Sequence, residues 1–145
     1  MANLGIEGLD ILLAKLEMLG GNTEEALQSG VDKAARRVKR DAKLLAPVDT
    51  GRLRNSIQHK IEKFQGKIIG SVYSNVEYAP YIEFGTGRRG ESSQILKPEG
   101  ISYRHDWQGQ PPVPFLYPAL IQNQENIKKD VTNEVKKAIR EVCNK

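Results

Sequence analysis

Cysteine and histidine are scarce in this chain of 145 residues. The single cysteine, Cys143, excludes an internal disulfide and is typical of a reducing compartment. The two histidines, His59 and His105, lie far apart in the sequence and lack further ligands at the spacing of common zinc sites. No Ser-His-Asp or Cys-His arrangement is evident either. We therefore expect no enzymatic activity, no cofactor, no metal ion and no small-molecule substrate.

Long hydrophobic runs are also missing. Hydrophobic residues make up 39% of the chain, and no run approaches the roughly 18 apolar residues of a membrane span. The first ten residues, MANLGIEGLD, have no basic region ahead of an apolar run, so we expect no signal peptide and no membrane contact. The length suits a single structural domain over residues 1–145, with part of the chain lying outside a modest core.

The chain does have strong helical periodicity near both ends. Leucines recur at three- and four-residue spacing over residues 8–19 and predict a short amphipathic helix. A longer helix should follow, capped by Asn22 and Glu25 and ended before Pro47. A last helix is predicted from about Tyr117 onward. The apolar positions of the long helix are Leu27, Val31, Ala34, Ala35, Val38, Ala42 and Leu45, and those of the last helix are Leu120, Ile127, Val131, Val135, Ala138 and Val142.

The middle of the chain has the pattern of strands and turns. Residues 56–64 and 67–74 flank a short turn at Gln65-Gly66, and they predict an antiparallel hairpin. Residues 76–84, with Pro80 near their start, predict a turn of helix.

The following segment, residues 85–114, is rich in glycine, proline and serine and holds one candidate strand near residues 101–107. Because few of its residues can anchor to a core, we expect a mobile loop at about residues 86–112. The order of elements predicts an α+β fold. It comprises a small antiparallel sheet of three to four strands, packed by long N- and C-terminal helices, with a long extended loop.

Positive charge is concentrated in residues 31–54. The chain carries a net charge of +4, and this segment holds eight cations against three acidic residues. Most of the cations lie opposite the apolar stripe, so they could face nucleic-acid phosphates, an acidic protein surface or only solvent. A nucleic-acid-binding module that uses this basic helix is therefore one alternative function. The cations are Lys33, Arg36, Arg37, Lys39, Arg40, Lys43, Arg52 and Arg54.

The triplet Asp49-Thr50-Gly51 has the letters of the aspartic protease motif. That chemistry needs two carboxylates that share a proton, each on a turn after an apolar strand. Here the triplet follows a helix, and Arg52 and Arg54 come directly after it, which favours an ionised carboxylate. We interpret the triplet as a corner in which Asp49 or Thr50 caps a short turn.

The segment Gly85-Thr86-Gly87-Arg88-Arg89-Gly90 matches the spacing of a dinucleotide-binding loop. That loop requires a buried strand before it and a helix after it, and neither pattern is present. We interpret the two arginines as part of a protein interface, together with aromatic and basic side chains later in the same segment. The candidate interface residues are Arg88, Arg89, Tyr103, Arg104 and Trp107.

Three stretches in this order resemble a family of phage virion proteins: 46-APVDTGRLRNSI-57, 74-SNVEYAPYIEFGTG-87 and 113-VPFLYPAL-120. The family comprises head–tail joining, neck or tail-completion proteins of long-tailed phages and prophages, and the similarity extends over roughly residues 5–140. The segment between Gly87 and Pro114 is shorter than the long basic hairpin associated with the family.

The resemblance implies a structural virion protein without catalytic residues, found in the virion and in the host cytoplasm during assembly. The implied partners are other copies of the chain in a ring, phage connector and tail proteins, and DNA through non-specific contact. It also implies a helix-to-strand corner at Pro47, Asp49, Thr50, Gly51, Leu53 and Ser56. Two further structural elements would contain Tyr78, Tyr81, Glu83, Phe84 and Gly85, and Pro114, Phe115, Leu116 and Pro118.

Overall fold

The structure, a computed structural model, describes residues 23–48, 51–95 and 97–143. The helix expected at residues 8–19 and its neighbour Asn22 lie outside the described residues. The elements are helices α2 (Thr23–Leu45), α3 (Arg52–Ser56), α4 (Ala79–Phe84), α5 (Gly87–Glu91), α6 (Leu116–Gln122) and α7 (Gln124–Cys143), and strands β1 (Ile57–Phe64) and β2 (Lys67–Ser74).

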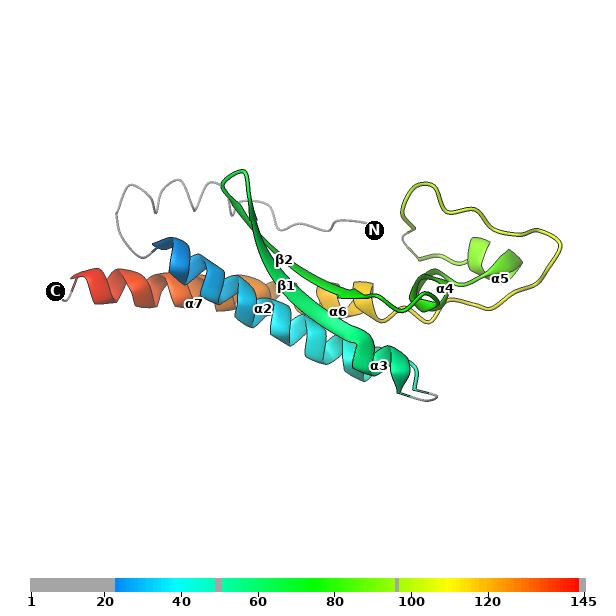
Figure 1. Cartoon of the computed structure of the whole chain (residues 1–145), viewed down its shortest axis with the longest axis horizontal. Coiled ribbons are helices and arrows are strands. Elements are labelled where there is room, and N and C mark those ends of the chain that lie inside the picture. The colour runs from blue at the N-terminus through cyan, green and yellow to red at the C-terminus, as the bar shows by residue number, and fades with distance from the viewer. Residues whose placement is uncertain (1–22, 49–50, 96, 144–145) are drawn as a thin grey trace.

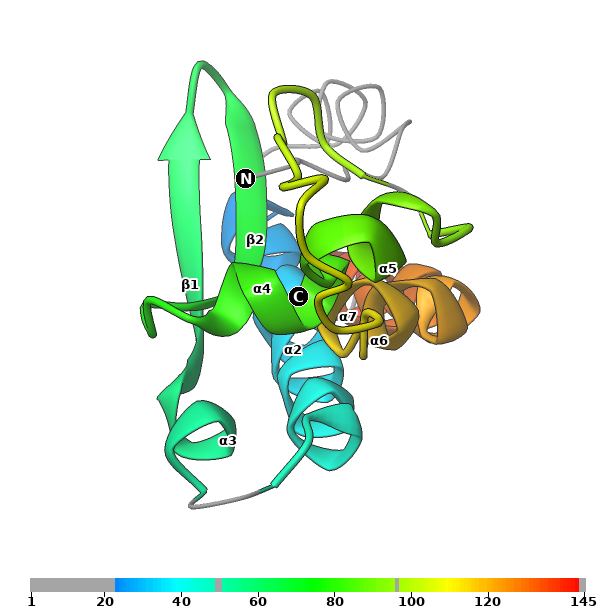
Figure 2. The ribbon, with the colours of Figure 1, turned by 90° about the vertical axis from the view of Figure 1, so that its right-hand side faces the viewer.

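Helix α2 lies at the centre of an elongated molecule (Figure 1). Helix α7 runs antiparallel along one side of it, while the β1–β2 hairpin crosses its other side (Figures 1 and 2). Helices α4 and α5 and the chain that follows them project from one end of this body (Figure 1). The α+β class predicted from the sequence is confirmed.

The apolar stripe of α2 is buried because two partners cover it, α7 and the hairpin. Its acidic first turn, Glu24 and Glu25, and its basic last turn, Lys43, suit the helix dipole. The helix ends at Leu45, ahead of Pro47, as predicted. Leu45 itself departs from the expected stripe: 38% of its surface is exposed in the last turn of α2. The buried members are Leu27, Val31, Ala34, Ala35, Val38 and Ala42.

Helices α2 and α7 approach each other closely at Gly30. A Cβ atom on this glycine would lie 2.7 Å from the Cα of Val131, closer than two such atoms can pack. Gly70 plays the same part between β2 and α2, because its Cβ would lie 2.7 Å from a methyl group of Val31. The absence of side chains at these two positions lets α2 bury both of its sides.

The hairpin has the predicted strands and turn. Its antiparallel register pairs Ile57 with Ser74 and Phe64 with Lys67, and Gln65 and Gly66 form the connection. Both turn residues have positive φ angles, 50° and 76°, as a two-residue turn of this hand requires. His59 of β1 faces α2 rather than solvent, since its Nε2 lies 3.1 Å from Asp32 Oδ1.

The expectation of three to four strands is wrong for the part of the chain that the structure describes, where the sheet has two strands. Residues 101–107 are irregular and pair with no strand. Carbonyl groups near the end of this stretch accept hydrogen bonds from the backbone of α5 instead. Helix α5, which the sequence did not predict, therefore uses the Trp107 carbonyl, which a strand over residues 101–107 would have needed.

Candidate functional site

The three motif stretches converge on one buried cluster. Leu53 and Ile57 come from the first stretch, Val76 and Ala79 from the second, and Phe115 from the third. Together with Ala119 they pack against α2 through Ala34, Val38 and Ala42, and Ala46, which follows α2, completes the cluster. A second cluster, made by Leu27, Val31, Val131 and Val135, holds α2 and α7 together farther along.

Glu83 connects the second stretch to the third. Its side chain is buried, with 4% of the residue surface exposed. Its Oε2 accepts the backbone N–H groups of Phe115 at 2.8 Å and Leu116 at 3.0 Å, and its Oε1 accepts that of Tyr117 at 2.9 Å. Pro118 has no N–H group. All four backbone positions at the start of α6 are thus accounted for, and the carboxylate also lies at the positive end of that helix.

The first stretch forms a corner between α2 and the hairpin. Gly51, at a φ of 81°, begins α3, and its carbonyl accepts the N–H of Asn55. Arg54 donates to the Lys43 carbonyl at 3.0 Å, so α3 is tied to the end of α2. Ser56 bonds the Leu53 carbonyl and the Ser74 hydroxyl, which fixes both strand ends. Pro47 lies exposed after α2, and the proposed caps, Asp49 and Thr50, lie outside the described residues.

The aromatic residues of the second stretch have different surroundings. The Arg52 guanidinium lies 5.5 Å from the centre of the Tyr78 ring, within range of a cation–π contact between the first two stretches. Tyr81 is largely exposed. The carbonyl of Phe84 accepts the hydroxyl of Tyr103 at 3.0 Å. The chain leaves the body formed by α2, α7 and the hairpin at Gly85 and returns to it at Pro114.

Asp41 fastens α2 to the junction of α6 and α7. Its Oδ2 accepts the Asn123 amide at 2.7 Å, and Asn123 also donates to the Ala119 carbonyl. The hydrogen bond from Asn123 is the main cause that lowers the pKa of Asp41, and Arg40 and Gln122 add to it while burial opposes it. The folded protein therefore favours the ionised carboxylate at this position.

We expect Asp41→Asn to change how stability depends on pH. A lowered folded pKa stabilises the folded state above the ordinary aspartate pKa, and this contribution is lost as the pH falls through the folded value. The variant should lose about 1 kcal/mol at neutral pH and show a smaller decline in stability below about pH 4. Urea unfolding from pH 3 to 7 tests this. An equal effect of Asp41→Asn in an Asn123→Ala background would contradict the assigned cause.

Ion pairs join the polar margins of α2 and α7. Arg37 donates from Nε and Nη2 to the two carboxylate oxygens of Asp130, both at 2.9 Å. One turn away, Lys33 pairs with Glu134, which lowers the pKa of that carboxyl group. The planar, two-point contact of Arg37 with Asp130 and the neighbouring pair of Lys33 with Glu134 together fix the register of α2 and α7.

Most cations of the basic segment 31–54 are therefore engaged within the chain. Besides Lys33 and Arg37, Arg36 pairs with Asp32 at 2.9 Å and Arg40 with Asp41 at 3.2 Å. Asp32 and Asp41 already belong to the acidic residues of this segment, whereas Asp130 and Glu134 add two carboxylates from α7, so the net charge of this face is smaller than segment 31–54 alone suggests. This weakens the argument for a phosphate-binding surface on α2.

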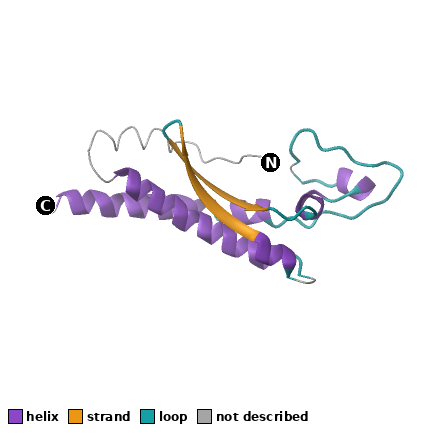
Figure 3. Cartoon of the chain, in the orientation of Figure 1, coloured by secondary structure: helices purple, strands orange, loops and turns teal. Residues whose placement is uncertain are grey.

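The segment 85–113, which we call the arm, is mostly loop (Figure 3). Backbone hydrogen bonds close it at its base. Thr86 donates to the Gln110 carbonyl at 3.0 Å, and Arg88 and Arg89 donate to the carbonyls of Trp107 and Gln108. Gly109 has a φ of 71°, and a Cβ on it would lie 2.0 Å from the Thr86 carbonyl oxygen. This close crossing holds the two sides of the arm together. The mobility expected for residues 86–112 remains a prediction.

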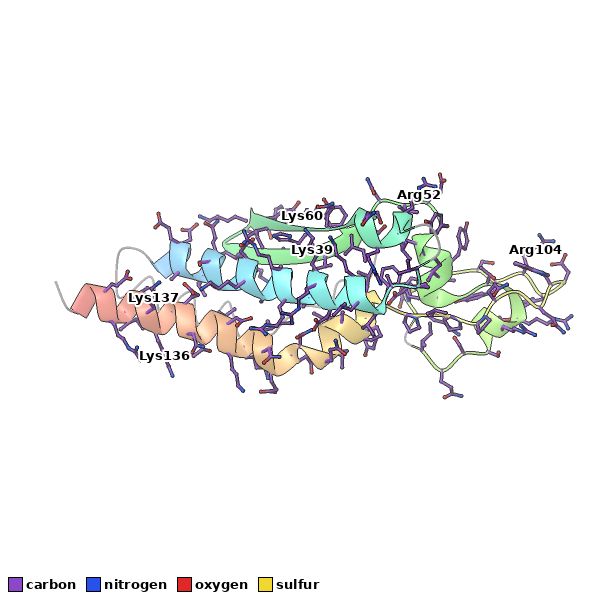
Figure 4. All side chains as sticks on the ribbon, turned by 90° about the horizontal axis from the view of Figure 1, so that it is seen from below. Lys39, Arg52, Lys60, Arg104, Lys136 and Lys137 are labelled. Carbon is purple, nitrogen blue, oxygen red and sulfur yellow. The ribbon has the colours of Figure 1, made fainter. Side chains whose placement is uncertain are left out.

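The five candidate interface residues all lie on the arm. Arg88 donates to the His105 carbonyl and Arg89 to the Gln108 side chain. Arg104, at the outer end of the arm in Figure 4, forms a two-point pair with Asp106. Tyr103 is half-buried, and burial raises the pKa of its hydroxyl group. Trp107 is 50% exposed and offers the largest apolar surface of the five.

Among the described residues, most exposed large apolar side chains lie in three separate places, and Ile121 of α6 lies apart from them. One set is on or beside the arm: Tyr81, Ile101, Trp107 and Val113. A second set follows the end of α2: Leu44, Leu45 and Val48. Phe64 and Ile69 form the third, near the turn of the hairpin. Patches of this kind are typical of protein contacts.

Metal and membrane sites find no support in the described residues. They hold no group of three or more metal-ligating side chains. Over the same residues, no helix is both long and apolar enough to cross a membrane.

Sequence reasoning missed Glu83 as a remote cap, although a signal exists. The helix predicted from about Tyr117 has no serine, threonine, aspartate or asparagine among the residues just before it, Phe115 and Leu116, to cap its start. Such a start requires an acceptor from elsewhere. No comparable pattern in the sequence indicates that Asn123 bonds Asp41 or that Gly30 lies where α2 and α7 meet.

Comparison with known proteins gives one family. A family model described as "Bacteriophage HK97-gp10, putative tail-component" matches residues 10–85. The match includes α2, the corner, the hairpin and α4, and it ends where the arm begins. No curated protein and no solved structure matches the chain. The match covers more than half of the chain, which therefore belongs to the HK97-gp10-like family of phage tail components.

Proposed function

We propose that this tail component is a structural protein that joins head to tail, or completes the tail, when a long-tailed phage or prophage particle assembles. It acts through contacts rather than a reaction, in the host cytoplasm during assembly and then in the virion. Its proposed partners are copies of itself and the phage connector and tail proteins.

The observation that carries this proposal is the distribution of exposed apolar surface. The arm lies far from the hairpin turn along the molecule (Figure 1). The exposed apolar sets at these two places differ in composition. A contact between two different surfaces of identical chains is heterologous, and heterologous contacts close into rings when the rotation permits. The arm, anchored at its base and exposed at Trp107, is suited to reach a neighbouring subunit.

Replacing Trp107 by alanine tests the proposal. Loss of an aromatic anchor from an interface typically costs about 2 kcal/mol or more, so the yield of complete tailed particles should fall at least tenfold. The fold should be retained, because Trp107 is half exposed and its backbone contacts do not need the indole. The measurement is a count of tailed particles by electron microscopy, with mass spectrometry of purified particles.

Trp107→Phe is the matched control, since it keeps an aromatic ring and should retain most of the yield. The thermal unfolding of both variants should match that of the wild type. Normal yield with Trp107→Ala would remove the arm from the proposed contact. Absence of the chain from purified wild-type particles would contradict the structural role itself.

A further inference from the structure

The outer face of α7 differs in charge from the face that packs on α2. The acidic residues Asp130 and Glu134 face α2, where Arg37 and Lys33 pair with them. The exposed acids described on α7, Glu125 and Glu141, lie near its two ends. Between them is a set of exposed cations that we call the α7 stripe: Lys128, Lys129, Lys136, Lys137 and Arg140. Lys128 pairs with Glu125 at 3.8 Å and Lys137 lies toward α2 in Figure 4, so the other three form the outer face.

Three members of the α7 stripe share one side of the helix. Lys129, Lys136 and Arg140 are separated by seven and four residues, spacings that return to the same face at 3.6 residues per turn. In Figure 4, Lys136 extends from the side of α7 turned away from α2. None of the three forms an ion pair with a residue that the structure describes. Their charge is therefore not offset within this part of the chain.

The composition of this face favours one class of partner. Protein interfaces are depleted in lysine and enriched in aromatic residues, whereas the α7 stripe has four lysines, one arginine and no aromatic side chain. The exposed apolar sets described above lie on the arm, the end of α2 and the hairpin. Double-stranded DNA carries one negative charge per about 1.7 Å of its axis, and lysine-rich surfaces bind it without reading its sequence.

We propose that the α7 stripe binds the phosphate backbone of double-stranded DNA without sequence preference. The stripe extends along about 18 Å of helix axis, from Lys128 to Arg140, at 1.5 Å per residue. This proposal places the DNA contact on α7 and not on the basic segment of α2. It does not depend on the proposed joining role.

The test compares two triple variants with the same change of charge. One is Lys129→Gln, Lys136→Gln and Arg140→Gln on α7, and the other is Arg36→Gln, Lys39→Gln and Arg40→Gln on α2. Glutamine keeps a similar helix propensity. Binding of a fluorescent duplex of mixed sequence, about 30 base pairs long, is measured from about 50 to 200 mM salt.

We expect the wild-type chain to bind the duplex with an affinity that falls steeply with salt. The α7 triple variant should weaken binding at least tenfold at the lowest salt. It should also flatten the log–log salt slope by about 2.7, since each lost phosphate contact removes about 0.9. The α2 triple variant should retain most of the affinity and most of the slope.

No binding by the wild type at the lowest salt would overturn the proposal, as would an equal loss in the α2 variant. If the wild type fails to bind DNA while the α7 variant fails to enter particles, an acidic protein surface is the partner and the proposal is wrong. Thermal unfolding verifies that both variants fold. Arg140→Gln alone serves as a milder variant, with an expected slope change of about 0.9.

Discussion

Replacing Glu83 by alanine is expected to destabilise the chain by about 3–4 kcal/mol, which would lower Tm by roughly 10 °C. The loss exceeds the cost of about 1 kcal/mol for an ordinary helix cap. Three backbone N–H groups, those of Phe115, Leu116 and Tyr117, lose their acceptor at once in a buried site. Chemical denaturation followed by circular dichroism measures the effect.

Two further variants separate the loss of the acceptor oxygens of Glu83 from the loss of its charge and from the loss of any carboxylate. Glu83→Gln keeps one acceptor oxygen and the side-chain volume but loses the charge, so its effect should be intermediate. Glu91→Ala removes an exposed carboxylate from the arm and should change stability by less than about 0.5 kcal/mol. Equal, small effects of Glu83→Ala and Glu91→Ala would show that α6 does not need the remote cap.

Phe115→Ala is expected to have a similarly large effect, about 3–5 kcal/mol, because it leaves a cavity in the core. Phe115 is fully buried and contacts the cluster to which all three motif stretches contribute. Its loss should free α4 and α6 from the C-terminal half of α2. Hydrogen exchange should therefore become faster in both of these helices and not only near the mutated residue.

Phe64→Ala makes the same chemical change at an exposed position. Phe64 lies at the hairpin turn, and 62% of its surface is exposed, so its replacement should change stability by less than about 0.5 kcal/mol. The loss of stability in Phe115→Leu should lie between those of Phe115→Ala and Phe64→Ala, because leucine keeps most of the apolar volume of phenylalanine. Equal losses for Phe115→Ala and Phe64→Ala would contradict the position of Phe115 in the core.

Together, the exposed apolar sets and the α7 stripe suggest a division of surfaces. Under the two proposals, the exposed Trp107 of the arm contacts protein partners, while the exposed cations on the outer face of α7 contact phosphates. The two proposals are independent, since Trp107→Ala changes particle assembly without removing a cation. The α7 triple variant changes DNA binding without altering the arm.

The sequence by itself determined the long helix α2 and the hairpin of this protein. The stripe from Leu27 to Ala42 repeats with the period of a helix, and Pro47 prevents its continuation. Gln65-Gly66 permits the two-residue turn between β1 and β2. These features are local: each depends on residues within a few positions, so a linear pattern is enough to predict them.

Only the tertiary structure decided which distant groups meet. Glu83 caps a helix more than thirty positions away, and Arg37 pairs with Asp130 across α2 and α7. The predicted third strand does not form for the same reason: the carbonyls of Trp107 and Gln108 accept hydrogen bonds from α5, and residues 101–107 pair with neither strand of the described sheet. Spacing in the sequence does not specify such partners. They follow from the packing of α2 against two neighbours, which brings residues far apart in the chain within hydrogen-bond distance.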